Sequence, residues 1–232
     1  MATRRRNRKY LLGNDTAASS MADFSPELAA VCTKWTLRTL IDLGAHEAIV
    51  QNTYCAEPGL MRALGVKSTL IDEYEQEHMM EALKLLHRDV VLAREARAAE
   101  AAAEAARAVQ GLKECALVRN IEWLAKQISL TDDEKSILLF CVMVRQNLFL
   151  GQAICALGML STARALSVLS ILLEIPLPRV HKAMSEDSGL IRSGMINIDE
   201  NSTFDFNNKI EMLNGLPEQL MLEQTNLFFL FS

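Results

Sequence analysis

Residues 189–206 read GLIRSGMINIDENSTFDF, and in this stretch the hydrophobic pattern of the chain changes from a helical period to an extended one. We take a period of two to begin at Leu190 and run to Asp199; apolar and polar side chains alternate strictly over Ile196–Asp199, which is typical of a half-buried strand. Glu200-Asn201-Ser202 favours a turn, and the alternation resumes over residues 203–206. We therefore predict a β-hairpin with strands at 190–199 and 203–206.

The sequence ahead of the hairpin predicts a series of helices. Thr131-Asp132-Asp133-Glu134 has the spacing of a capping box and begins one of them, and Ser161 is placed to cap another over residues 163–173. After the break at Pro176-Leu177-Pro178, a short helix is expected over 179–186. Helices, a tight turn, a short helix and a hairpin follow one another in a winged helix, so we expect a winged-helix-like domain. Helix and hairpin periods predict that five side chains are buried together: Leu166, Leu169, Val180, Met184 and Ile196.

The front half predicts a mainly α fold. Ser25 and Pro26 suit the cap and first turn of a helix over 25–43, and an alanine-rich helix is expected to end near Gly111. An amphipathic pattern over 112–128 indicates a further helix. We expect four regions, namely a disordered basic arm (1–24), a helical domain ending in a long alanine-rich helix (25–110), the winged-helix-like domain (111–222) and an irregular tail (223–232).

The composition is that of a soluble, helix-rich chain. Of its 232 residues half are hydrophobic, the net charge is −5, and only ten Gly and five Pro interrupt it. No stretch reaches the ~18 uninterrupted apolar residues of a membrane helix. The basic run from Arg4 to Lys9 lacks the apolar core of a signal peptide after it. We therefore expect a cytoplasmic protein with no membrane partner.

The cysteines are odd in number and scattered, with no Cys-x-x-Cys pair. This pattern favours buried free thiols in a reducing compartment over disulfides. No histidine lies at ligand spacing from a cysteine, so no zinc site is expected. The five are Cys32, Cys55, Cys115, Cys141 and Cys155.

The sequence contains no motif of a known catalytic class. A serine nucleophile elbow, a His-Glu-x-x-His motif and a Gly-x-Gly-x-x-Gly loop are all absent. Asp132, Asp133 and Glu134 suit the first turn of a helix, where acids cap amides and complement the dipole. His181 is expected to be an ordinary surface residue. We therefore expect no catalytic residue, no cofactor and no metal.

Several segments together resemble the region that precedes the motor in a group of bacterial AAA-family ATPases. The likeness covers roughly residues 22–222 and implies a front region that binds a substrate or partner protein. It is carried by Trp35-Thr36-Leu37-Arg38, Leu43-Gly44, Leu124-Ala125, Leu130-Thr131-Asp132-Asp133-Glu134, Leu138-Leu139-Phe140, Val180, Ala183-Met184-Ser185, the run 190–199 and Lys209-Ile210-Glu211-Met212-Leu213.

This chain departs from those ATPases in having no P-loop. No Gly-Lys dipeptide occurs anywhere in it, so the phosphate-cradling motif cannot exist. We therefore expect a non-catalytic adaptor region that binds another protein, and we leave open whether it forms a homo-oligomer.

Binding of DNA by the winged helix is the alternative. Arg179, Lys182 and Arg192 would then face the groove or the backbone. Between residues 131 and 216, however, 7 Lys and Arg stand against 10 Asp and Glu, giving 7 − 10 = −3. A phosphate-binding surface is normally basic. The charge therefore favours a protein partner, with transcription regulation through DNA as the second hypothesis.

The C-terminal residues generate the first testable prediction. Five of the last six residues before Ser232 are Leu or Phe, and neither structural period continues after Leu222, as expected for a truncated or frame-shifted reading frame. Deleting residues 223–232 should leave the melting temperature unchanged and reduce self-association, because an exposed apolar segment promotes association. Thermal denaturation and light scattering measure both. A large fall in melting temperature would instead identify the tail as a structural element.

Overall fold

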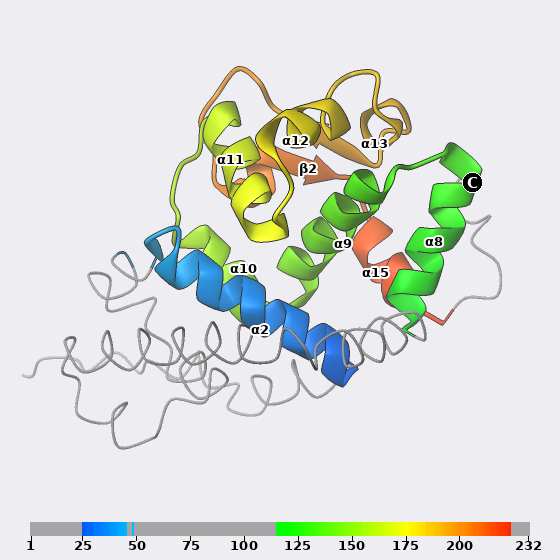
Figure 1. Ribbon diagram of the computed structural model, residues 1–232, viewed down its shortest axis with the longest axis horizontal. Coiled ribbons are helices and arrows are strands. Elements are labelled where there is room, and N and C mark those ends of the chain that lie inside the picture. Colours follow the sequence, from blue (N-terminus) through cyan, green and yellow to red (C-terminus); the bar gives the residue numbers. More distant parts are fainter. Residues whose placement is uncertain (1–24, 46–47, 49–114, 224–232) are drawn as a thin grey trace, which may run out of the picture.

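The computed structural model describes residues 25–45, 48 and 115–223. The basic arm, the alanine-rich helix expected before Gly111 and residues 224–232 of the tail lie outside the described residues. The described part is mainly helical, with nine helices and one small antiparallel sheet (Figure 1). The helices are α2 (Pro26–Ile41), α8 (Ala116–Ile128), α9 (Asp132–Gln146), α10 (Leu148–Cys155), α11 (Thr162–Leu173), α12 (Leu177–Ala183), α13 (Gly189–Arg192), α14 (Phe206–Lys209) and α15 (Leu216–Met221), and the strands are β1 (Ile196–Ile198) and β2 (Ile210–Met212).

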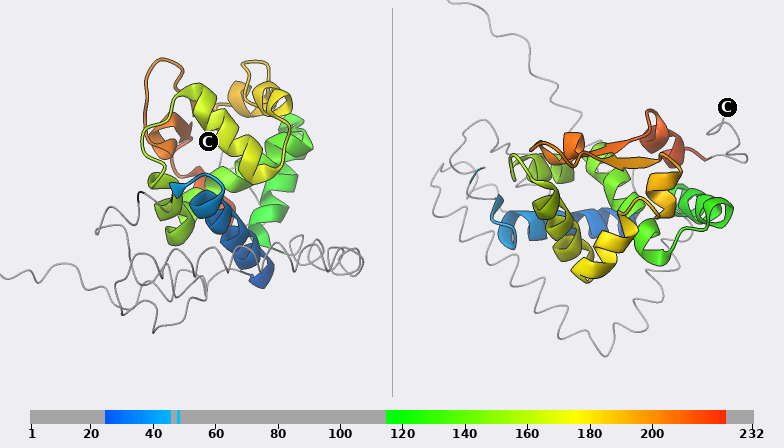
Figure 2. Two further views of the ribbon diagram at one scale, coloured as in Figure 1. Left: turned by 60° about the vertical axis from the view of Figure 1, so that its left-hand side comes forward. Right: turned by 90° about the horizontal axis from the view of Figure 1, so that it is seen from above.

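Helix α9 is the centre of this fold. All of its apolar residues except the partly buried Leu139 are buried, as expected of a helix that other elements enclose. It contacts α8 and α15 on one side, α10 at its C-terminal end, and α11, α12 and α13 elsewhere (Figure 1). Seen from above, β1 and β2 form one wall of the helical body (Figure 2). The buried residues of α9 are Glu134, Ile137, Leu138, Phe140, Cys141, Val142, Met143 and Val144.

Helix α2 belongs to the same core. The ring of Trp35 packs edge-on against Phe140 with centroids 5.1 Å apart, and Phe140 packs in the same way against Phe206 at 5.7 Å. This row of rings runs from α2 through α9 to α14, and edge-to-face pairs of this kind are favourable. We expected the helix at 25–43 to belong to a separate domain ending at residue 110. Among the described residues it shares one hydrophobic cluster with residues 117–220.

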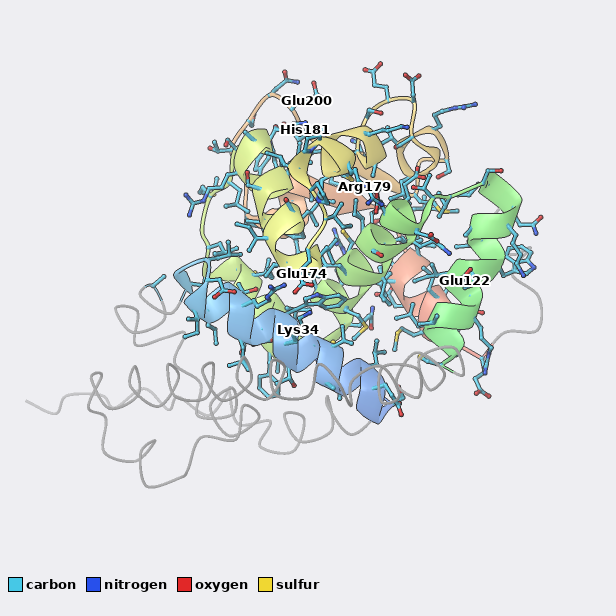
Figure 3. All side chains as sticks on the ribbon, viewed as in Figure 1. Lys34, Glu122, Glu174, Arg179, His181 and Glu200 are labelled. Carbon is cyan, nitrogen blue, oxygen red and sulfur yellow. The ribbon has the colours of Figure 1, made fainter. Side chains whose placement is uncertain are left out.

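Polar contacts at the end of α11 also hold α2 in place. Arg38 donates hydrogen bonds to the carbonyls of Ile171 and Leu172, and it pairs with Glu174 at 2.8 Å. Lys34 reaches the same carboxylate at 3.2 Å (Figure 3). The last carbonyls of a helix carry partial negative charge and lack intrahelical donors, so an arginine there is favourable.

The three predicted helix caps are confirmed. Ser25 accepts from the amide of Leu28, and Thr131 and Glu134 form the expected reciprocal capping box. Ser161 accepts from the amide of Arg164 at the start of α11. The short helix expected at 179–186 begins two residues earlier, at Leu177, and ends at Ala183. Proline is favourable in the first turn, where an amide would have no partner, so Pro178 begins this helix instead of only ending the preceding segment.

The hairpin prediction was correct in type and wrong in its strands. Strand β1 covers only 196–198, and its partner is 210–212 instead of 203–206. Residues 189–192 form the short helix α13, because Ser188 caps the amide of Ile191. Within the expected second strand, Phe204 makes an isolated bridge to Leu160, and Asp205 caps α14. Local capping therefore replaces extended structure at both ends of the alternating stretch.

The cysteines of the described residues are free thiols, as predicted, although their burial varies. Cys32 and Cys141 are buried, and burial raises the pKa of each thiol to about 12. Cys155 is exposed, contrary to the expectation of burial.

No single helix among the described residues is long and apolar enough to cross a membrane. Helices α9 and α10 reach that length and composition only as a pair, which is bent by 98°.

The packing of α11 generates the second prediction. Leu169 is 0% exposed and lies in the core cluster with the four other residues predicted to surround it. Leu169→Ala should lower the free energy of unfolding by roughly 2–5 kcal/mol, because it removes buried methyl groups and leaves a cavity. Ile171→Ala is the matched control on the same helix, since Ile171 is 43% exposed. Urea denaturation compares the two, and an equal destabilisation by both variants would contradict this packing.

Candidate interaction site

The structure brings together two of the three residues predicted to contact DNA. Arg179 and Lys182 lie on α12, and both line a surface cleft of about 480 Å³. Arg192 is exposed at the end of α13 and does not line this cleft. The cleft lies between α12, the N-terminus of α9 and the loop at 185–189. We take it as the candidate interaction site.

The first turn of α9 places a carboxylate directly on Arg179. The side chain of Arg179 donates from Nε to Oδ2 and from Nη2 to Oδ1 of Asp133, both at 2.7 Å. This is the bidentate geometry in which guanidinium and carboxylate interact most strongly. Asp133 is the more buried partner, with its side chain 17% exposed against 62% for Arg179. The positive charge of Arg179 is therefore paired with Asp133, and its Nε and Nη2 face α9.

The same turn of α9 carries a buried carboxylate, Glu134, which is 3% exposed. Its Oε2 accepts from both the amide and the hydroxyl of Thr131 at 2.7 Å. Its Oε1 accepts from the amide of Leu190 at 3.3 Å. Burial raises the pKa of Glu134, but the hydrogen bonds from Thr131, Leu190 and Gly189 outweigh it and bring the pKa below its ordinary value. Glu134 therefore links the start of α9 to the start of α13.

Gly189 lets these two helix starts approach each other. A Cβ at this position would lie 2.8 Å from Cδ2 of Leu130 and 3.3 Å from Oε1 of Glu134. The contact with Leu130 is closer than real Cβ atoms show, so any other residue would displace its neighbours. The glycine thus serves the close approach of α13 to the capping box.

Most lysine and arginine side chains between residues 131 and 216 bind other groups of the protein. Lys209 is fully buried and donates from Nζ to the carbonyl of Ser202 at 2.6 Å. Arg145 donates to three backbone carbonyls, those of Cys141, Asn207 and Ile210, and burial lowers the pKa of its guanidinium.

Lys135 is also paired, with Glu122 at 2.9 Å and with Asp132 at 2.8 Å. Together with Arg179, Lys209 and Arg145, four of the seven cations counted between residues 131 and 216 are therefore engaged. Arg164, Lys182 and Arg192 are exposed and make no ion pair with a described residue.

Sequence reasoning missed the internal roles of Arg145 and Lys209. Arg145 interrupts an apolar helix and Lys209 precedes an apolar strand residue, and a charge in such a context is the signal that could have indicated burial. His181 is exposed on α12, as expected (Figure 3). In the part of the chain that the structure describes, no group of three or more His, Cys, Asp or Glu could hold a metal ion.

Comparison of the chain with protein-family models, with curated proteins and with solved structures finds no match.

The buried carboxylate generates the third prediction. Glu134→Gln should lower the free energy of unfolding at neutral pH by about 1–3 kcal/mol, because the carboxamide keeps one acceptor oxygen and places an NH2 donor against the donors at the other position. The pKa of Glu134 is lower in the folded chain than in the unfolded one, so its stabilisation is present above the unfolded pKa of about 4.3. That stabilisation is lost as the pH falls through the folded pKa.

Urea denaturation between neutral and acidic pH measures this effect. The difference between wild type and Glu134→Gln should shrink as the carboxyl is protonated. Glu186→Gln is the matched control, because Glu186 is exposed at the edge of the same region and should change stability by no more than about 0.5 kcal/mol. A difference that is independent of pH would show that the carboxylate charge does not contribute.

Proposed function

We propose that this chain is a non-catalytic protein-interaction module, an adaptor region built around a winged-helix-like unit. The order of α9, α10, α11, α12, β1 and β2 supports this, as does the bridge between Leu160 and Phe204 beside the strands. The resemblance to the front region of AAA-family ATPases is the reason for choosing an adaptor role. Protein-binding modules of this kind need a shaped surface and no reactive group.

The observation that carries the proposal is the bidentate pair between Arg179 and Asp133. In a DNA-binding protein, α12 would be the helix whose cations meet phosphate or base edges. Here the arginine of that helix is held by an acid of α9, and Glu186 and Asp187 are exposed directly after α12. The surface around α12 is therefore close to neutral or acidic, which suits a protein partner better than a polyanion.

DNA binding is kept as the second candidate because of three exposed cations. Arg164, Lys182 and Arg192 make no ion pair with a described residue, so they are available to phosphates. A protein that neutralises phosphates releases counterions, and its affinity then falls steeply with salt. The salt dependence of binding therefore separates the two candidates.

The fourth prediction compares DNA binding by the wild type and by a Lys182→Ala/Arg192→Ala double variant, since both side chains are exposed and make no ion pair with a described residue. Fluorescence anisotropy with a labelled duplex over a range of salt concentrations should show weak binding, and the two proteins should behave alike. If the rival hypothesis holds, the double variant should flatten the plot of log affinity against log salt by about 1.8, because each phosphate that a cation neutralises adds about 0.9 to the slope. That result would overturn the protein-interaction proposal.

A parallel selection tests the proposal directly. The full chain is immobilised and presented with a random library of displayed linear peptides, and we expect enrichment of a sequence pattern.

Binding of ATP in the micromolar range would contradict the non-catalytic assignment.

A further inference from the structure

A second cleft lies at the hairpin, away from α12. Its volume is about 680 Å³, within the range of ligand-binding sites. Residues of both strands and of α14 line it, and four of the lining residues are asparagines. The lining residues used below are Arg145, Asn207, Asn208, Glu211, Met212 and Leu213.

The hydrogen-bond phase of the ladder determines which backbone groups face this cleft. The amide of Leu213 donates to the carbonyl of Met195, and the amide of Asp199 donates to the carbonyl of Lys209. With the register in which Ile196 lies opposite Met212, these bonds make 195–213, 197–211 and 199–209 the hydrogen-bonded pairs. The backbone groups of Ile210 and Met212 therefore point away from β1, toward the free edge of β2.

Among the described residues, one position of this edge, Met212, keeps unpaired backbone groups. The carbonyl of Ile210 accepts from Nη2 of Arg145 at 2.7 Å, so Arg145 closes the edge at its N-terminal end. The amide and the carbonyl of Met212 have no hydrogen-bond partner among the described residues. An unpaired strand edge is a template for another extended chain. The opening at Met212 offers one donor and one acceptor side by side.

The side chains beside this opening differ in chemistry. Glu211 and Leu213 both point to the outer face, and both are exposed, Leu213 to 45%. Glu211 makes no ion pair with a described residue, whereas Leu213 is one of the large apolar side chains left in solvent. The carboxamide of Asn207 lies at the same cleft, and its buried Oδ1 has no hydrogen-bond partner among the described residues.

We propose that an extended peptide of a partner protein adds to the edge of β2 at Met212, a mode of recognition in which main-chain bonds supply affinity and side chains supply specificity. This inference rests on the proposed protein-interaction function and assigns it a site. An antiparallel peptide residue exchanges both of its backbone bonds with Met212 alone, which matches the single open residue. The peptide therefore runs antiparallel to β2.

The antiparallel direction determines the sequence that fits. The residue before the paired one lies opposite Leu213, and the residue after it lies opposite Glu211. Directly opposite side chains in a sheet interact, so an apolar residue suits Leu213 and a basic one suits Glu211. The expected motif is apolar, then a small residue, then Lys or Arg. Toward its C-terminus the bound peptide cannot pair further, because the carbonyl of Ile210 already accepts a hydrogen bond from Arg145.

The test titrates the full chain with a labelled peptide, Gly-Ser-Thr-Leu-Ser-Lys-Thr-Ser-Gly, and follows the amide resonances by NMR. The Met212 and Leu213 amides should shift on binding. Met212→Pro removes the backbone N–H that would donate to the peptide. It leaves the hydrogen bonds between β1 and β2 intact, and proline is tolerated at such edge positions. It should weaken binding about fivefold, the value of one hydrogen bond. Ile198→Pro is the matched control, because it removes an outward amide from the opposite edge of the same hairpin and should leave binding unchanged.

A charge exchange keeps the test independent of any folding defect. Glu211→Lys should weaken binding of the Lys peptide about threefold and favour a peptide with Glu in place of Lys by a similar factor. If Glu211→Lys does not change which peptide is preferred, the proposed site at Met212 is wrong. Equal losses of affinity in Met212→Pro and Ile198→Pro would also contradict it. If this peptide fails to bind while the random library still enriches other linear peptides, the site is wrong and the protein-interaction function stands. If the library enriches nothing and the chain binds DNA through Lys182 and Arg192, both proposals fail.

Discussion

The fifteen-residue helix α9 is apolar on nearly every side, and the rest of the described chain is arranged to keep water from it. Fully burying one large apolar side chain contributes about 1.5–3 kcal/mol, so leaving one side of α9 uncovered would cost several times that. Phe140 illustrates the requirement, because it is covered by Trp35 on one side and by Phe206 on the other. The positions of α2 and α14, more than 150 residues apart in sequence, follow from this one helix.

In the described chain, the buried Glu134 and Lys209 and the partly buried Arg145 all hydrogen-bond to the backbone. Glu134 accepts amides at the starts of α9 and α13, whereas Arg145 and Lys209 donate to carbonyls of the segment from 202 to 210. A buried charge without partners would be very costly, so these groups secure the segments whose polar atoms they satisfy. The connection between β1 and β2 is therefore not a tight turn but a longer segment held by Arg145 and Lys209.

This internal use of charge also bears on function. The cations that stabilise the hairpin and the capping turn are withdrawn from the surface, and the one on α12 is held by Asp133. On the part of the chain that the structure describes, the surface has a neutral to acidic face at α12 and, at Met212, one strand-edge residue whose backbone groups are unpaired. Both features suit recognition of another polypeptide, and the edge at Met212 is the more specific of the two because its hydrogen bonds have a defined direction.

The sequence by itself determined the elements whose signals are local. Caps such as Ser25, Thr131 and Ser161 act within three residues, and the 3.6-residue period of α11 was enough to predict that Leu169 and Val180 lie in one core. Only the tertiary structure decided which strand pairs with β1, because Asp205 capping α14 and Lys209 reaching Ser202 outweigh the alternation at 203–206. The partner of Arg179 was likewise not readable, since Asp133 lies 46 residues away and looks locally like any helix-starting acid. Capping and periodicity act over one or two helical turns, whereas ion pairs, strand register and the covering of α9 depend on which segments the folded core brings together.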